Sequence, residues 1–257
     1  MKTKSLGFIG GGRITQIFLQ AFANKNSEFQ SVVVFDTNTE VTDGLQKLFP
    51  QIEIAESLEQ AASHSTIFIA LHPPVIMETL TKIEEVVPTD SLVISLAPKI
   101  TIGKIAAKLK TANIARMIPN ATSYINEGFN PISFAPGFTP HEKVKLMELM
   151  KLLGNTFEVE EPKLEAYAII SAMLPTYFWF QWKELVHLGT QMNLTEEESK
   201  AAVEQTLLSA VRLMFGSSLS PDQVIDLIPV KPIGEHQTQL CEIYQSKLLS
   251  LYEKIKP

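Results

Sequence analysis

The sequence predicts an α/β domain with a parallel sheet, followed by an all-helical domain. The first half alternates short β-branched runs with amphipathic stretches, which is the pattern of βαβ units covered by helices on both faces. After about residue 160 the strand signals stop and only helical patterns remain. A chain of 257 residues with 45% apolar composition can bury two cores. We therefore expect domains at residues 1–158 and 159–257.

Each expected element of the first domain has its own local signal. Apolar, β-branched runs predict strands at residues 6–10, 31–36, 66–71, 91–97 and 113–118. Helical periodicity predicts helices between them, at residues 13–24, 41–49, 75–87 and 101–110. The run "NPISFAP" and the helical pattern of residues 140–156 are expected to complete the sheet.

The second domain carries clear helix boundaries. Residues 163–193 predict one long, mostly apolar helix. Thr195, with Glu198 three residues later, predicts a capping box at the start of the next helix. Ser220 and Pro221 predict another N-terminus. The break "PVKPIGEH" then precedes a final helix over residues 237–255.

Composition excludes several classes of function. A net charge of −6 with scattered basic residues argues against a nucleic-acid partner. The single cysteine, Cys241, excludes an internal disulfide and a cysteine-built zinc site, and favours the cytoplasm. No histidine pair has helix-face metal spacing, so no metal is expected. The apolar stretch 166–182 is too short and too interrupted to span a membrane, and instead predicts a buried helix at the interface of a homodimer or higher homo-oligomer.

The segment "GGGRIT", residues 10–15, is typical of a dinucleotide-binding turn. Gly10 would form the tight strand-to-helix turn and Gly12 would admit a pyrophosphate at the helix N-terminus, with Arg13 and Ile14 beside it. The dinucleotide-binding fingerprint is G-x-G-x-x-G, and Thr15 stands where this fingerprint has its last glycine. Asp36 ends the next strand, where an acceptor for the ribose 2′-hydroxyl belongs.

These residues predict a Rossmann-type domain that binds NAD or NADP. The Asp36 carboxylate would repel a 2′-phosphate and so favours NAD, although Arg13, Thr37 and Asn38 would surround a phosphate if Asp36 turned away. The residues after the strand at 66–71 lie at a ligand-binding end of the sheet. They are Ala70, Leu71, His72 and Pro73.

The chain resembles the pyrroline-5-carboxylate reductase family over nearly its whole length. "GFIGGGRI" resembles the family's "GFIGAGNM", "IFIALHPP" its "VILAVKPQ", "ISLAPKITIGKI" its "ISIAAGI", and "ARMIPNATSYINEG" its "RVMPNTPALVGEG". The resemblance implies hydride transfer from a reduced nicotinamide to the C=N carbon of a cyclic imine, as in proline biosynthesis. It also implies that Asn120 contacts the nicotinamide or the substrate, although a turn residue after Pro119 is the alternative.

The substrate half departs from the family. Against "SGSGPAY" the chain keeps Ser171, Pro175 and Tyr177; the hydroxyls of Ser171 and Tyr177 are candidates for contacting the reacting nitrogen. Against "TSPGGTT" it has "VKPIGEH" at residues 230–236. There Lys231 is a candidate for binding a substrate carboxylate, Glu235 for an amine, and His236 for proton donation. A solvated linker is the alternative for these three.

Two other functions fit parts of the sequence. A β-hydroxyacid dehydrogenase would use Lys183 as its catalytic lysine, but the asparagine expected about one turn later is absent. A cofactor-binding sensor or scaffold would keep the nucleotide site and lose the reaction. The altered segments around Ser171 and Lys231 agree with that interpretation. The substrate expected for an enzyme is a small imine or an amino-acid-like molecule.

Overall fold

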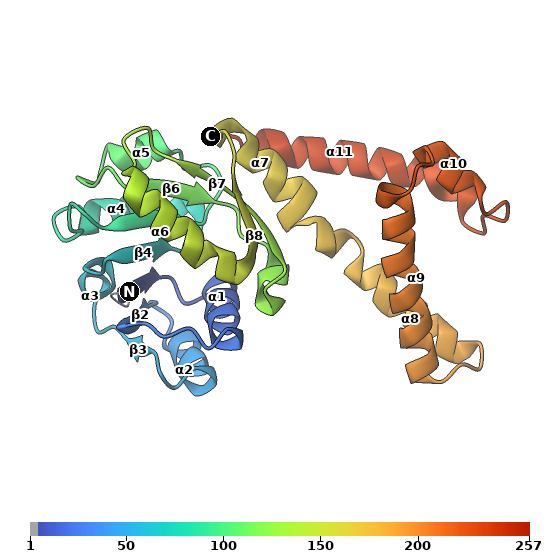
Figure 1. The fold of residues 1–257 in the computed structure, drawn as a ribbon, viewed down its shortest axis with the longest axis horizontal. Helices are drawn as coiled ribbons and strands as arrows, with labels where there is room; N and C mark the ends of the chain where they lie inside the picture. The colour runs from blue at the N-terminus through green and yellow to red at the C-terminus, as the bar shows by residue number, and fades with distance from the viewer. Residues whose placement is uncertain (1–4) are drawn as a thin grey trace. The chain divides into compact units, whose positions relative to one another are not determined.

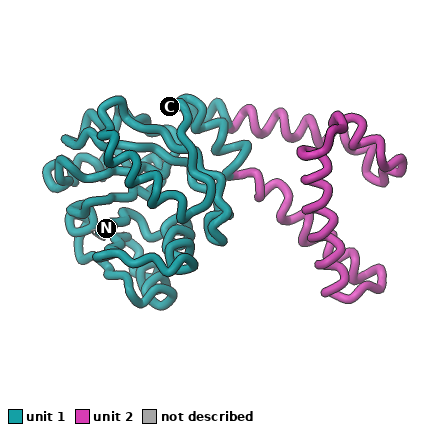
Figure 2. The backbone as a smooth tube through the Cα atoms, viewed as in Figure 1, with its two compact units in different colours: residues 1–172, 252–257 teal, residues 173–251 magenta. Residues whose placement is uncertain are grey.

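The computed structural model describes residues 5–257. The chain folds into two compact units (Figure 2), which we describe separately. Unit 1 comprises Met1–Ala172 and Tyr252–Pro257, of which residues 1–4 lie outside the described part. Unit 2 comprises Met173–Leu251.

Unit 1 is an α/β domain built on one eight-stranded sheet (Figure 1). The strands are β1 (Ser5–Ile9), β2 (Ser31–Phe35), β3 (Glu53–Ile54), β4 (Thr66–Ile69), β5 (Leu92–Ser95), β6 (Ile114–Met117), β7 (Gly128–Phe134) and β8 (Gly154–Glu158). Their order is β3-β2-β1-β4-β5-β6-β7-β8. The first six run parallel in the order of dinucleotide-binding domains, and β7 is antiparallel to β6. The predicted Rossmann-type sheet is confirmed.

Helices cover both faces of this sheet. They are α1 (Arg13–Asn24), α2 (Thr39–Leu48), α3 (Leu58–Ala62), α4 (Pro73–Ile83), α5 (Ile102–Ala106) and α6 (Pro140–Met150). One core joins α1, α2 and α6 to the sheet around Phe8, Phe18 and Phe68, whose rings stack or meet edge to face. The other core joins α3, α4 and α5 to the opposite face. Burial of these two apolar faces stabilises the sheet.

Unit 1 continues past the last strand because the next segment packs against the sheet. α7 (Leu164–Tyr167) contributes Leu164, and the π-helical turn Ala168–Ala172 contributes Ala168, to a small core with Ile118. Ile255, in the last turn of the chain, packs on the same core. The strands end at Glu158, where the sequence places its domain boundary, whereas the compact unit runs to Ala172. The boundary at residue 158 stays a prediction.

Unit 2 is helical, as predicted. It contains α8 (Trp179–Gln191), α9 (Glu196–Gly216), α10 (Pro221–Asp226) and the greater part of α11 (Gln237–Ile255). The capping box of Thr195 and Glu198 is confirmed, as is the Ser220 cap before Pro221. One expectation is wrong: residues 163–193 do not form a single helix. A π-helical turn and a 3₁₀ turn at Leu174–Tyr177 interrupt it, where Pro175 has no N–H to continue the helical ladder.

Candidate functional site

The turn after β1 requires glycine at position 10. Gly10 has a φ of 105°, and its N–H donates to the Phe35 carbonyl at 2.8 Å. A Cβ here would lie 2.5 Å from the Ala70 carbonyl oxygen. Both the left-handed backbone and the close approach of the β4 end therefore exclude a side chain. This is the tight turn that the sequence predicts.

Gly12, in contrast to Gly10, has free space around it: nothing in the protein lies within 4 Å of where its Cβ would be. It is the N-cap of α1, makes no side-chain cap, and has no acidic residue in the turn that follows. The first N–H groups of α1, from Arg13 and Ile14 onward, therefore lack a capping side chain, and Gly12 and Arg13 are exposed. A helix N-terminus of this kind fits the pyrophosphate of a dinucleotide.

Thr15 replaces the last glycine of the fingerprint without loosening the turn. Its side chain is fully buried, and its hydroxyl donates to the Gly10 carbonyl at 2.6 Å. The glycine normally lets helix and strand pack closely. Here a threonine fits the same contact and adds a hydrogen bond across the turn.

Asp36 is held by the fingerprint turn itself. Its Oδ2 accepts the Gly11 N–H at 2.7 Å, and its Oδ1 accepts the Asn38 N–H at 2.9 Å. The carboxylate is half-buried at the end of β2. Two backbone donors hold it beside the glycine turn, and each oxygen retains acceptor capacity for a hydroxyl.

The β4 end lies against this turn. Ala70 donates its N–H to the Ile9 carbonyl at 2.8 Å, and Leu71 is half-buried beside it. His72 is the exposed N-cap of α4, with Pro73 in the first turn. The strand order reverses between β1 and β4, so these residues border the crevice where doubly wound sheets bind ligands.

Asn120, after β6, is joined to Ser171 rather than being free. Its Nδ2 donates to the Ser171 carbonyl at 3.3 Å and lies 3.2 Å from its Oγ, while its Oδ1 accepts the Thr122 N–H and hydroxyl. The Asn120 N–H donates to Asn130 at 2.8 Å. The structure thus brings two predicted site residues together. It also gives Asn120 a positioning role within the protein.

The remaining candidates belong to unit 2. The Tyr177 ring lies 6.1 Å from that of Tyr244, and burial, with a smaller contribution from Tyr244, raises the pKa of the Tyr177 phenol. Glu235 and His236 lie in a 3₁₀ turn and are largely exposed. The His236 Nε2 lies 3.6 Å from the Glu235 Oε1. Lys231 is exposed and forms no ion pair with the residues that the structure describes.

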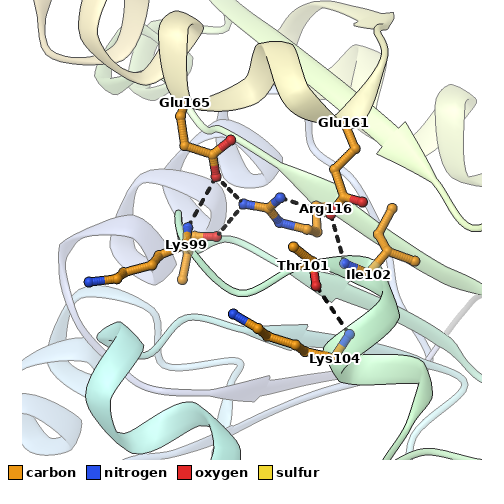
Figure 3. A network of polar contacts seen from close by, with 8 residues as sticks. Lys99, Thr101, Ile102, Lys104, Arg116, Glu161 and Glu165 are labelled. Atoms are coloured by element: carbon orange, nitrogen blue, oxygen red, sulfur yellow. Dashed lines mark hydrogen bonds and ion pairs between the residues drawn. The ribbon is translucent and has the colours of Figure 1, made fainter. Parts of the chain in front are cut away.

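Sequence reasoning missed a buried ionic cluster in unit 1 (Figure 3). Arg116, on β6, is fully buried and contacts Glu161 at 2.8 Å and Glu165 at 2.5 Å. Glu165 also accepts the Lys99 N–H at 3.1 Å, and Glu161 accepts the Ile102 N–H at 2.7 Å. The signal was a single arginine within the strand-forming run "NIARMI", because a charge in a buried strand needs a partner.

Residues 5–257 contain neither a metal centre nor a membrane-spanning helix. No group of three or more acidic, histidine or cysteine side chains among them is placed to hold a metal ion. No helix in that range is long and apolar enough to cross a membrane.

Comparisons with known proteins agree with the fold and the fingerprint turn. A family model described as "NADP oxidoreductase coenzyme F420-dependent" matches residues 5–99. The pyrroline-5-carboxylate reductase of Staphylococcus aureus is 24% identical over 252 residues, covering 96% of this chain and 92% of that protein.

Solved structures match over the whole length. The pyrroline carboxylate reductase of Plasmodium falciparum, solved with NADP bound, has a TM-score of 0.76 at 22% identity, covering 99% of this chain and 95% of that one. The 1-pyrroline-5-carboxylate reductase of Streptococcus pyogenes has a TM-score of 0.76 at 17% identity, covering 99% and 97%. The chain is thus similar over nearly its full length to pyrroline-5-carboxylate reductases, and it shares their fold.

Proposed function

We propose that the chain is an NAD(P)H-dependent reductase of a cyclic imine of the pyrroline-5-carboxylate type. The observation that carries the proposal is the turn at residues 10–15, where Gly10 cannot be replaced and Gly12, the N-cap of α1, is exposed with no side-chain cap. This turn lies in a chain similar over 96% of its length to a pyrroline-5-carboxylate reductase. A reduced nicotinamide, when bound, supplies the hydride for the C=N carbon.

The chain's own residues would bind the cofactor, orient the imine and donate to its nitrogen. Gly10, Gly12 and the first turn of α1 would hold the pyrophosphate, and the loop from Ala70 to Pro73 would border the nicotinamide. Asn120 and Ser171, bonded to one another, would keep the β6 loop at a fixed distance from the helical segment that follows.

The Tyr177 phenol is the candidate hydrogen-bond donor to the imine nitrogen. A tyrosine is protonated at neutral pH, and the raised pKa of Tyr177 makes its phenol a weaker acid, which suits donating a hydrogen bond more than transferring the proton. A cyclic iminium needs little acid catalysis, so we expect Tyr177 and Ser171 to orient the nitrogen more than to activate it. Lys231, Glu235 and His236 stay candidates for contacts with the substrate.

We further propose that NAD is preferred to NADP. The support is that Asp36 receives two backbone hydrogen bonds, one of them from Gly11 in the fingerprint turn. A carboxylate held there would have to break both bonds to make room for a 2′-phosphate. In place, it would accept from a 2′-hydroxyl and repel the phosphate.

We propose that the chain works as a homodimer through unit 2. Of the described residues in that unit, the structure buries only Ser199. Large apolar side chains are exposed instead, including Phe215 at 84%, Phe180 at 66% and Trp179 at 47%. An α-helical unit without its own core needs another apolar surface to cover it, and a second copy supplies a self-complementary one. We place the protein in the cytoplasm, where a free, exposed Cys241 stays reduced.

The alternative is a protein that binds the dinucleotide and lacks the reaction. The altered segments around Ser171 and Lys231 favour it, because they replace residues of the family pattern in the substrate half. A β-hydroxyacid dehydrogenase is disfavoured, since the asparagine expected about one turn after Lys183 is absent.

One experiment separates these functions. Purified protein is mixed with NADH or NADPH and a panel of cyclic imines with and without a carboxylate, and the nicotinamide absorbance is followed. Binding is measured in parallel by thermal shift. Oxidation with an imine supports the reductase. Stabilisation by the cofactor without oxidation by any imine supports the alternative.

Two glycine variants test whether the turn is responsible. Gly10→Ala should lose both cofactor stabilisation and activity, because its Cβ collides with the Ala70 carbonyl. Gly44→Ala is the matched control: Gly44 lies within α2 with open space around it, so an alanine should fit and leave both readouts unchanged. Equal behaviour of the two variants would refute the assignment of the turn.

A further inference from the structure

The loop after β5 contains a strained turn centred on a lysine. Lys99 has a φ of 75°, and the Ile100 N–H donates to the Pro98 carbonyl at 3.0 Å, which closes a three-residue turn around it. This left-handed γ-turn is rare and strained for residues with a side chain. Among the described residues, the other non-glycine residues with positive φ are all asparagines. The family pattern "ISIAAGI" has glycine at this position.

The buried ionic cluster holds this turn in place. The Lys99 N–H donates to Glu165, which is 1% exposed and paired with the fully buried Arg116. Arg116 also reaches the Ala97 carbonyl, and Glu161 receives the Ile102 N–H just beyond the turn. The loop is therefore fixed on both sides of Lys99 by groups on β6, in the 3₁₀ turn Glu161–Lys163 and in α7. An anchored, strained lysine costs stability that a glycine would not.

The side chain of Lys99 is free to bind. It is exposed, and Figure 3 shows it extending away from Arg116 and the two carboxylates. It forms no ion pair within residues 5–257. The loop stands at the carboxyl end of β5, between the ends of β4 and β6, which is the ligand-binding edge of a parallel sheet.

Lys99 and the candidate residue Asn120 lie on two loops that are held by the same segment of the chain. Lys99 is bonded to Glu165 and Asn120 to Ser171, so both loops are attached to one helical segment. Those two attachment points are six residues apart in the sequence. The lysine and the asparagine that the resemblance places at the substrate therefore belong to neighbouring loops held by one segment.

We propose that the Lys99 ammonium binds the carboxylate of the imine substrate, and that the strained turn is kept to aim it. This inference rests on the proposed reductase function. It makes Lys99 a specificity-determining residue, placed where the family pattern has glycine. Lys99 and Lys231 are then competing candidates for binding the same carboxylate, and variants of the two residues distinguish them.

The test compares two imines, 1-pyrroline-5-carboxylate and 1-pyrroline, which lacks the carboxylate. Lys99→Met removes the charge and keeps the Cβ, whereas Lys99→Gly removes the charge and relieves the turn. In both variants kcat/KM for the carboxylated imine should fall about 10- to 100-fold, mostly through KM, the range of one charge-assisted hydrogen bond. The values for 1-pyrroline should stay within about twofold. Lys99→Gly alone should raise the melting temperature.

Control variants make the result specific to Lys99. Lys99→Arg should restore most of the lost kcat/KM. Lys104→Gln, which removes an exposed lysine with ordinary backbone from the adjacent α5, should behave as the wild type. The inference is overturned if Lys99→Met lowers kcat/KM equally for both imines. It is also overturned if Lys231→Met abolishes the preference for the carboxylated imine and Lys99→Met does not. A wild type that reduces 1-pyrroline but shows no preference for the carboxylated imine overturns it and leaves the proposed function standing. A wild type that reduces neither overturns both.

Discussion

Removing Arg116 should destabilise the protein far more than removing any surface cation. Arg116→Met would leave Glu165, at 1% exposure, buried without a counter-charge. Glu161, at 26% exposure, would regain water more readily. Breaking a buried pair by removing one partner costs about 3–5 kcal/mol, since the remaining charge keeps its desolvation penalty.

The expected shift in melting temperature follows from the size of the chain. A protein of this length loses about 2–4 °C for each kcal/mol, so Arg116→Met should melt about 6–20 °C below the wild type. Lys82→Met is the control. It breaks an ion pair with Glu78 in which both side chains are more than half exposed, and such pairs contribute about 0–1 kcal/mol. Its melting temperature should fall by less than about 4 °C.

A double variant tests the pairing itself. Arg116→Met with Glu165→Gln removes both charges and leaves an amide able to accept the Lys99 N–H, so it should recover at least part of the lost stability. Calorimetry on all four proteins gives the coupling energy. Two results would show that the cluster is not the buried ion pair described above. One is a melting temperature of Arg116→Met equal to that of the wild type. The other is a double variant whose loss of unfolding free energy is the sum of the losses in the two single variants.

Three further outcomes are expected. Asp36→Ala should weaken NADH binding about tenfold and NADPH binding much less, because it removes one charge-assisted hydrogen-bond acceptor and a repulsive charge; an unchanged ratio of the two dissociation constants would count against the role of Asp36. Thr15→Val should cost about 1–3 kcal/mol in urea unfolding, since the buried Gly10 carbonyl loses its donor, while Thr15→Ser should cost less; similar losses in both would mean that packing dominates. Burial lowers the pKa of His64, with Glu53 opposing, so the unfolded state binds the proton more readily: the contribution of His64 is present above pH 6.5 and is lost as the pH falls below it. Wild type should therefore lose more stability than His64→Gln between about pH 7.5 and about pH 5.5, and parallel curves would contradict the assignment.

Much of unit 1 could be predicted because its signals are local. The glycine turn, Asp36 and the β-branched runs each occupy a few adjacent residues, and the parallel order follows from their alternation with helices. β3 escaped prediction because it has only two residues, Glu53 and Ile54, too few for a periodic pattern. The helix caps at Thr195 and Ser220 could also be predicted, because each cap depends on a few adjacent residues.

The features that escaped prediction depend on distant partners or on backbone angles. Arg116 finds its carboxylates 45 and 49 residues later, on another element, and no local pattern links them. The bond from Asn120 to Ser171 spans 51 residues. A positive φ at Lys99 cannot be read from a residue that rarely adopts one. The break in the long helix was signalled by Pro175, but the π-helical turn before it has no sequence signature.

The exposed apolar helices of unit 2 have a consequence for how the protein responds to dilution. If a second copy covers unit 2, as proposed above, the folding free energy of this unit depends on the protein concentration, because the unit buries only one of its described residues by itself. Unit 1 has two cores of its own and carries no such dependence. Lowering the protein concentration should then disorder the helices of residues 173–251 while the nucleotide-binding turn survives, leaving a molecule that still binds its cofactor. In a cell, the level of expression would set the fraction of chains able to complete the reaction.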